Sequence, residues 1–142
     1  MVRGNVYCLE HDETYAHTTR ANLLRHGLSE HATVLYAPLR LHSIAGQDWL
    51  WYDEDKLPQN LNVDMLVIDG PPEGTGQFAR YPAGPVLFGS IVPGGIVFLD
   101  DAARDDEKAI VERWKQEWPT TIVEYRPCEK GCAVLRMPDN LS

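Results

Sequence analysis

Three short apolar runs, each followed at once by a carboxylate, constrain the fold of this chain most. The runs are residues 6–9 before Glu10, residues 65–68 before Asp69, and residues 96–99 before Asp100 and Asp101. Short runs without polar alternation are typical of parallel strands that are buried on both faces. Ligands of an open parallel sheet bind beyond the carboxyl ends of its strands, so we expect these acidic side chains to share one rim. Such a rim suits ribose hydroxyls, a cationic ligand or a divalent metal.

Length and charge limit the class of protein. A chain of 142 residues is long enough for a single domain, over residues 1–142, with its own core. Its net charge of −8 repels phosphate backbones, so we expect no nucleic-acid partner. No apolar run approaches the roughly 20 residues of a membrane-spanning helix, and the first residues do not resemble a signal peptide. We therefore expect a cytoplasmic protein without a membrane partner.

The three cysteines give little chemical information. Cys8 lies in a predicted buried strand, and Cys128 and Cys132 are separated by three residues. A zinc site would need two further ligands nearby, and the sequence around this pair offers none. We expect reduced, structural thiols, as is usual for a cytosolic protein.

Strand and helix patterns alternate along the chain. The pattern predicts strands at residues 5–9, 33–36, 64–68 and 96–99, and helices at residues 13–26, 81–92 and 105–118. Asp12 is suited to cap the first helix and Gly27 to end it. Residues 41–62 show no regular pattern, and residues 93–95 are expected to form a turn.

The last part of the chain predicts a reversed strand. Two strand patterns, at residues 121–125 and 132–136, are joined by a short connection. A connection of this length makes a hairpin, so the final strand should run antiparallel. The whole chain is thus expected to form an α/β fold. We expect a Rossmann-like, mostly parallel sheet with helices on both faces and an antiparallel C-terminal hairpin strand.

This order of elements, with an acidic residue ending the first strand and a reversed hairpin at the end, resembles the class I S-adenosylmethionine-dependent methyltransferases. Residues 9–12, 64–72, 79–82 and 93–104 resemble a bacterial subgroup that methylates small molecules. The resemblance covers nearly the whole chain. It implies S-adenosylmethionine as cofactor and a small molecule as methyl acceptor.

The chain departs from that family in one respect. Family members begin one βα unit earlier, and that unit carries the glycine-rich cofactor loop. Here only residues 1–5 precede the first strand, and Gly94 and Gly95 precede a strand instead of following one. We expect an exposed sheet edge where the family's first strand would pair. Homodimerisation or a missing N-terminal segment would cover that edge.

The resemblance assigns cofactor contacts to three strand ends. Glu10 would accept hydrogen bonds from the ribose hydroxyls, and His11 would flank the ribose; a solvated carboxylate and a solvated loop residue are the alternatives. Leu39 follows the second strand, where the family contacts adenine, although nothing polar stands there. Asp69 completes the expected cofactor set.

The same resemblance implies a metal and two catalytic carboxylates. In the magnesium-dependent catechol-type O-methyltransferases, carboxylates at these strand ends bind Mg²⁺, so Asp69, Asp100 and Asp101 are candidate ligands. Asp69 and Asp100 would orient or activate the acceptor, with Asp69 also suited to act as a general base. Alternatively, Asp100 caps the turn that follows it.

Three further residues are candidates for substrate binding. Arg80 and Tyr81 could meet an anionic substrate at the rim, although Arg80 could equally pair with an acidic residue. Arg104 could contact substrate or form a surface ion pair. The aromatic residues between 49 and 52 could line a flat pocket, but we favour a role in covering a sheet edge.

Together these features predict methyl transfer from S-adenosylmethionine to an oxygen or nitrogen of a small molecule, with possible help from Mg²⁺. The alternative is a non-catalytic module that keeps the fold but does not bind the cofactor.

Overall fold

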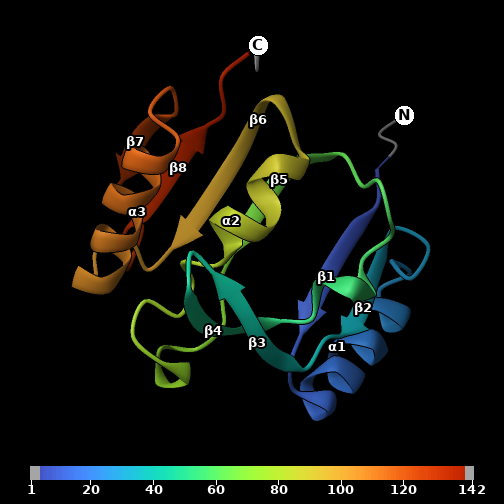
Figure 1. The fold of residues 1–142 in the computed structure, drawn as a ribbon. Coiled ribbons are helices and arrows are strands. Elements are labelled where there is room, and N and C mark those ends of the chain that lie inside the picture. Colours follow the sequence, from blue (N-terminus) through green and yellow to red (C-terminus); the bar gives the residue numbers. More distant parts are fainter. Residues whose placement is uncertain (1–3, 140–142) are drawn as a thin grey trace.

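The computed structural model describes residues 4–139 as strands and helices that alternate in the expected α/β order (Figure 1). The strands are β1 (Val6–Glu10), β2 (Ala32–Tyr36), β3 (Leu39–Ile44), β4 (Gln47–Tyr52), β5 (Val63–Ile68), β6 (Ile91–Asp100), β7 (Ile122–Arg126) and β8 (Cys132–Arg136). The α-helices are α1 (Glu13–Arg25), α2 (Ala83–Leu87) and α3 (Asp105–Glu117). Single 3₁₀ turns lie at Glu54–Lys56, Glu73–Thr75 and Phe88–Ser90. Among the described residues no helix is both long and apolar enough to cross a membrane.

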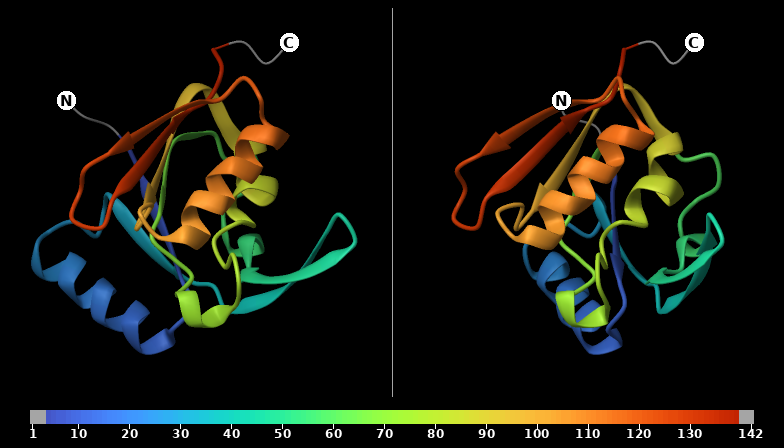
Figure 2. Two further views of the ribbon diagram at one scale, coloured as in Figure 1. Left: turned by 90° about the vertical axis from the view of Figure 1, so that its left-hand side faces the viewer. Right: turned by 60° about the vertical axis from the view of Figure 1, so that its left-hand side comes forward.

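Backbone hydrogen bonds divide the strands into three sheets. β1 and β2 form a parallel pair, and β3 and β4 form an antiparallel hairpin whose tip projects away from the rest of the molecule (Figure 2). The third sheet has the order β5-β6-β8-β7; β5 and β6 are parallel, and β8 is antiparallel to both its neighbours. The parallel strands and the reversed C-terminal hairpin are confirmed. The expectation of one continuous sheet is not met, because β1 and β5 are not hydrogen-bonded to each other.

Helix α1 begins where its capping residue predicts. The Asp12 carboxylate accepts a hydrogen bond from the Tyr15 amide at 3.0 Å, and Glu13 places negative charge in the first turn. Gly27, with φ of 69°, continues the chain in the left-handed region just beyond the helix. The helix packs on the β1–β2 pair, where the Arg20 Nε and Nη2 groups donate to the Val34 carbonyl.

The core lies between the four-stranded sheet and helices α2 and α3. Val97, Leu99 and Leu135 of the sheet are fully buried against Ile110 and Trp114, which lie four residues apart on one face of α3. The Trp114 Nε1 group donates to the Tyr81 carbonyl at 3.1 Å. Gly84 of α2 packs directly on the Trp114 ring, where a Cβ atom would overlap Nε1. This contact holds α2 and α3 together over the sheet.

We expected residues 41–62 to be irregular. This expectation was wrong, because the β3–β4 hairpin occupies the first part of the segment. Ala45 and Gly46, with φ of 51° and 80°, form its two-residue turn. Such turns usually carry asparagine or aspartate with glycine, so Ala-Gly gave no clear signal. Trp49 and Trp51 point to the same face of β4 and are 7% and 3% exposed. Both belong to the buried core cluster, so these two residues do not line a flat pocket.

The segment from residue 81 to 95 also differs from the expected long helix and turn. Helix α2 is short and passes into a 3₁₀ turn, and β6 begins at Ile91 instead of after residue 95. Pro85 lies in the first turn of α2, where a missing amide is tolerated because the first amides of a helix have no intrahelical acceptor. Gly94 and Gly95 extend β6, because they bond to the chain end that leaves β8, at Pro138 and Met137.

The C-terminal hairpin also corrects the expectation for the cysteines. Cys128 and Cys132 form a disulfide rather than two reduced thiols, and Cys8 is free. The loop between β7 and β8 brings the two Cα atoms to 5.7 Å, which lies within the range of disulfides. The sequence spacing alone could not show this, because it depends on the hairpin geometry.

Candidate functional site

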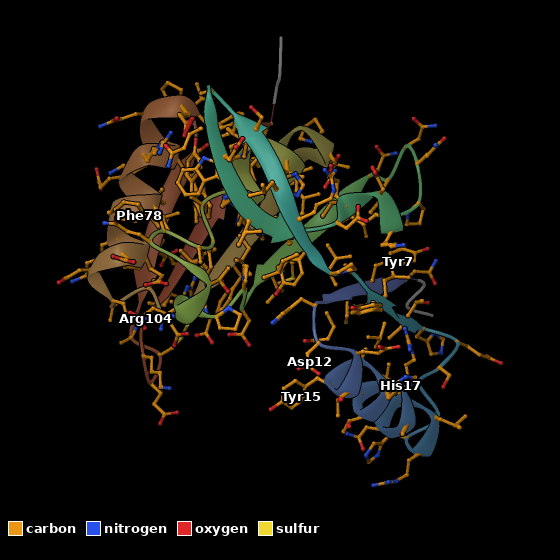
Figure 3. The ribbon with its side chains drawn as sticks, turned by 60° about the horizontal axis from the view of Figure 1, so that its bottom comes forward. Tyr7, Asp12, Tyr15, His17, Phe78 and Arg104 are labelled. Carbon is orange, nitrogen blue, oxygen red and sulfur yellow. A yellow bond between two sulfur atoms is a disulfide. The ribbon has the colours of Figure 1, made fainter. Side chains whose placement is uncertain are left out.

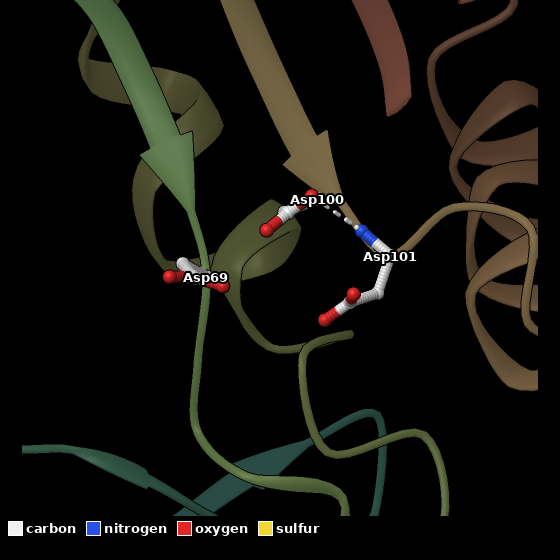
Figure 4. Close-up of side chains that lie close together, drawn as sticks. All are labelled: Asp69, Asp100 and Asp101. Carbon is white, nitrogen blue, oxygen red and sulfur yellow. Dashed lines mark hydrogen bonds between the residues drawn. The ribbon is translucent and has the colours of Figure 1, made fainter. Parts of the chain in front are cut away.

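The carboxylates that follow β5 and β6 form a cluster, as the strand ends predict. Asp69, Asp100 and Asp101 each offer an oxygen, and these oxygens lie within 4.8 Å of one another (Figure 4). One Asp100 oxygen accepts a hydrogen bond from the Asp101 amide at 2.9 Å. Asp101 has a φ of 57°, and this left-handed backbone turns its side chain back toward Asp69. The parallel pairing of β5 and β6 therefore brings together three residues that are far apart in the sequence.

The cluster concentrates negative charge. Burial raises the pKa of Asp69, and the neighbouring Asp100 carboxylate raises it further. Arg80 acts in the opposite direction, but the net shift remains upward. A carboxylate whose pKa is raised in this way favours binding a proton or a cation.

Arg80 is buried beneath this cluster and binds its backbone. It is 4% exposed, and its guanidinium donates to the carbonyls of Asp69 at 3.2 Å and Asp100 at 3.0 Å. It also lies 3.3 Å from a carboxylate oxygen of Asp101. The pairing with an acidic residue that we considered is present. The expectation that Arg80 faces substrate is corrected, since its guanidinium binds the protein and fixes the ends of β5 and β6.

Tyr81 is not at the rim either. It is 1% exposed, and its hydroxyl donates to the Glu117 carboxylate, at the end of α3. Its ring lies beneath the Arg113 guanidinium, 4.0 Å from the ring centre, and beside Trp49. The expectation that Tyr81 contacts substrate at the rim was wrong, because its side chain points into the core.

Arg104 joins the cluster to helix α3. Its guanidinium nitrogens lie 3.0 Å from Asp101, 3.1 Å from Glu73 and 3.2 Å from Glu107. Glu107 is buried, and this burial raises its pKa against the opposing effect of Arg104. Arg104 is one third exposed, so it forms ion pairs and still reaches the solvent at the rim.

Glu10 and His11 lie at the end of β1. One Glu10 oxygen, Oε1, accepts a hydrogen bond from the Asp12 amide at 3.1 Å and lies 3.7 Å from the His11 Nδ1 atom. Within residues 4–139 the other oxygen, Oε2, has no hydrogen-bond partner, and about a third of the side chain is exposed. Glu10 is therefore held in place and can still accept hydrogen bonds from a ligand.

Tyr52 joins the β1 end to the carboxylate cluster. It ends β4, pairs with Leu39 across the hairpin, and places its ring 6.1 Å from that of His11. Its hydroxyl lies over the Gly70 backbone, next to Asp69, where a Cβ atom on residue 70 would collide with it. Burial and the nearby Glu10 and Asp69 carboxylates raise the pKa of Tyr52 to about 12, although Arg80 lowers it.

The structure thus gathers seven of the nine predicted site residues around one rim, whereas Arg80 and Tyr81 are buried. Glu10, His11 and Leu39 surround Tyr52 on one side, and the carboxylate cluster with Arg104 forms the other side. Figure 3 views the molecule from this end, with Asp12 and Arg104 on opposite sides of the rim. Sequence reasoning did not place Tyr52 at the junction, because the β3–β4 turn carried no recognisable signal.

Comparison with known proteins identifies the fold. No family model and no curated sequence match the chain. Among solved structures, the O-methyltransferase from Bacillus cereus in complex with SAH is similar with a TM-score of 0.62 and 15% identity, over 94% of this chain and 63% of that one. An SAH-bound methyltransferase from Podospora anserina is similar with a TM-score of 0.63 and 14% identity, over 95% of this chain and 61% of that one. A structure described as a putative rRNA methylase from Clostridium thermocellum has a TM-score of 0.62 and 16% identity, over 96% of this chain and 76% of that one.

The chain spans less than two thirds of the length of the Bacillus cereus and Podospora anserina structures. Sequence identities this low show that the fold is shared, but they do not show that the activity is shared. The element order, the parallel strands and the reversed hairpin agree with these structures. The chain has the class I, S-adenosylmethionine-dependent methyltransferase fold.

Proposed function

We propose that this chain is a methyltransferase domain whose rim binds S-adenosylmethionine and a small-molecule acceptor. The observation that carries the proposal is the meeting of Glu10, Tyr52 and the Asp69 cluster at the carboxyl ends of β1 and β5. A single rim thus offers a carboxylate for ribose beside acidic groups that suit an acceptor. The SAH that accompanies two of the similar structures supports the choice of cofactor.

Glu10 is the residue we assign to the cofactor. Its Oε1 atom is fixed by the Asp12 amide, and its Oε2 atom is oriented without a protein partner in the described chain. A fixed carboxylate at a strand end can accept hydrogen bonds from ribose hydroxyls, as in dinucleotide-binding folds. His11 and Leu39, both next to Tyr52, would lie along the same ligand.

The acceptor is assigned to the Asp69 side of the rim. Asp69 would accept the proton of the acceptor hydroxyl or amine. Bound S-adenosylmethionine would supply the methyl group to the oxygen or nitrogen so activated. The raised pKa of Asp69 suits a general base, because it brings the carboxylate closer to the working pH. The net charge of −8 favours a small acceptor over a nucleic acid.

The donor set fits a magnesium ion. Asp69, Asp100 and Asp101 present hard oxygen ligands within 4.8 Å of one another, and Asp69 and Asp100 repel each other without a cation. Bound Mg²⁺ would lower the pKa of an acceptor hydroxyl, and Asp69 would then serve as a metal ligand in place of a general base. Arg80 and Arg104 already neutralise part of Asp101, so Asp69 and Asp100 are the principal ligands we propose.

Calorimetric titration with S-adenosylhomocysteine tests the cofactor assignment. We expect binding that Glu10→Gln weakens about tenfold or more, or about 1.4 kcal/mol. Glu13→Gln is the matched control, because Glu13 lies on the exposed side of α1, three residues away, and should leave the affinity unchanged. Equal affinities of the wild-type and Glu10→Gln chains would contradict the role of Glu10. No binding by a folded chain would favour the non-catalytic alternative.

A second titration tests the metal. Mg²⁺ should raise the melting temperature of the chain, since an ion that binds only the folded state stabilises it. Asp69→Asn should abolish the increase, whereas Asp48→Asn, at an exposed position of β4, should keep it. A Mg²⁺ effect of the same size in both variants would show that the ion acts elsewhere.

A further inference from the structure

A loop closed by a disulfide joins β7 to β8, at the end of the sheet where the carboxylate cluster lies. The disulfide links Cys128 and Cys132, which are four residues apart. Cys132 begins β8 and pairs with Asp100, which ends β6. Residues 128–132, which we call the disulfide loop, therefore adjoin the turn that carries Asp100 and Asp101.

Two carbonyls of the disulfide loop hold the backbone that follows Asp101. The Gly131 carbonyl accepts a hydrogen bond from the Ala102 amide at 3.0 Å. The Lys130 carbonyl accepts one from the Ala103 amide at 3.2 Å. The two segments are also in close contact, because a Cβ atom on Gly131 would lie 2.8 Å from the Ala103 nitrogen. A movement of the disulfide loop therefore acts directly on this turn.

The backbone of Asp101 depends on such support. Its φ of 57° lies in the left-handed region, which is unfavourable for residues other than glycine and persists where the surrounding structure holds it. In this conformation the Asp101 carboxylate joins those of Asp69 and Asp100. Release of the next two amides would let Asp101 return to a commoner backbone conformation and move its carboxylate out of the cluster.

The position of the disulfide allows its reduction in the folded chain. Cys128 is exposed, whereas Cys132 is 3% exposed, so a thiolate from solution can reach the Cys128 sulfur. A disulfide that closes a short loop stabilises a chain less than one that closes a long loop. Strands β7 and β8 are also paired through their backbones from Ile122 to Arg126. The chain can therefore keep its fold with either a disulfide or two thiols, as a switch requires.

We propose that the Cys128–Cys132 disulfide is a redox switch that controls the position of Asp101 in the carboxylate cluster. With the disulfide formed, the loop holds the turn after β6 and the cluster is assembled. With two thiols, the loop relaxes, the Ala102 and Ala103 amides lose their acceptors, and Asp101 leaves the cluster. The effect on the backbone stands by itself, and only its consequence for cation binding rests on the proposed function.

The reductant is a dithiol, which supplies two electrons and two protons. One of its thiolates attacks the Cys128 sulfur, the bond between the cysteines breaks, and Cys132 leaves as a thiolate that takes up a proton. The second sulfur of the dithiol then attacks the mixed disulfide and releases Cys128, which is protonated in turn. The dithiol is thereby oxidised to its own disulfide, and the protein gains two thiols.

Hydrogen exchange with dithiothreitol as the dithiol tests the switch. A Cys8→Ala chain is used, because it lacks the free thiol. We expect millimolar dithiothreitol to reduce the folded chain and to speed exchange of the Ala102 and Ala103 amides about tenfold or more. The Met137 amide, bonded to the Gly95 carbonyl at the other end of β8, should not change.

The exchange data have three outcomes that would overturn the proposal. The first is a disulfide that dithiothreitol does not reduce while the chain is folded. The second is unchanged exchange at Ala102 and Ala103 after reduction. The third is equal acceleration at Met137, which would show a general loss of stability. Glu129→Gln, an exposed change in the same loop that keeps both cysteines, is the control and should exchange like the parent chain before and after reduction.

Calorimetric titration with Mg²⁺ alone tests the consequence for the site. Cys128→Ser is compared with Glu129→Gln, so that no reductant is present to bind the metal. We expect Cys128→Ser to bind Mg²⁺ about tenfold more weakly. Equal affinities would overturn the control of the cluster by the disulfide. No binding by either chain would contradict the magnesium assignment alone, because exchange at Ala102 and Ala103 measures the switch without the metal.

Discussion

Replacement of Arg80 by methionine should be among the most destabilising changes at the rim. Methionine fills a similar volume but removes the guanidinium that binds Asp69, Asp100 and Asp101. Two backbone carbonyls would then lose their donor in a partly buried setting. The Asp101 carboxylate would keep Arg104 as a partner, at 3.0 Å.

The size of the effect follows from these contacts. Hydrogen bonds to charged groups contribute about 1.5–3 kcal/mol each, and removal of one partner from a buried ion pair costs about 3–5 kcal/mol. Because Arg104 still neutralises part of Asp101, we expect a loss of about 4 kcal/mol. With a urea m-value of about 2 kcal/mol/M, the unfolding midpoint should fall by about 2 M.

Urea unfolding followed by tryptophan fluorescence measures this loss. The unfolding midpoint of Arg80→Lys should lie between those of the wild-type and Arg80→Met chains, because lysine keeps the charge but cannot reach all three acceptors. The matched control is Arg126→Met, an exposed arginine paired with Glu124, which should cost less than about 0.5 kcal/mol. A loss below about 1 kcal/mol for Arg80→Met would refute the view that this side chain holds the ends of β5 and β6 together.

Three further changes probe the core and the cluster. The pKa of Tyr81 is raised to about 12, so the stability that its protonated hydroxyl contributes is lost as the pH rises from about 10 to about 12. In Tyr81→Phe the free energy of unfolding should therefore fall less steeply over this pH range. Asp69→Asn removes the repulsion between the Asp69 and Asp100 carboxylates and should stabilise the chain at neutral pH. The gain should be only about 0.5 kcal/mol, because solvent screens charges at this exposed position. It should vanish at acidic pH, where Asp69 is protonated. A gain that persists in acid would contradict this cause. Gly84→Ala should cost about 1–3 kcal/mol in urea unfolding by forcing Trp114 to move, whereas Gly89→Ala, with open space around its Cβ position, should not.

Features that depend on local patterns could be predicted from the sequence. The Asp12 cap, the buried face of α3 and the hairpin of β7 and β8 follow from residue spacing within one segment. The carboxylate cluster was also predictable, because parallel strands bring their carboxyl ends to one rim.

Features that depend on contacts between distant segments could not be predicted. Arg80 could be named as a partner of an acidic residue, but its burial against the ends of β5 and β6 depends on how the turn before α2 packs. Tyr52 reaches Gly70 only because the β3–β4 hairpin folds over the rim. The separation of β1 from β5 is likewise a property of the whole sheet and has no local signal.

Amide chemical-shift mapping with S-adenosylhomocysteine tests the central claim most directly, because it locates the ligand as well as detecting it. We predict shifts of the Glu10, His11, Leu39 and Asp69 amides, all at the rim. The amides of Ile122 and Arg136, which pair at the other end of the β7–β8 hairpin, should not respond. Shifts confined to surfaces away from the ends of β1 and β5, or no shifts at millimolar ligand, would contradict the assignment of this rim as a cofactor site.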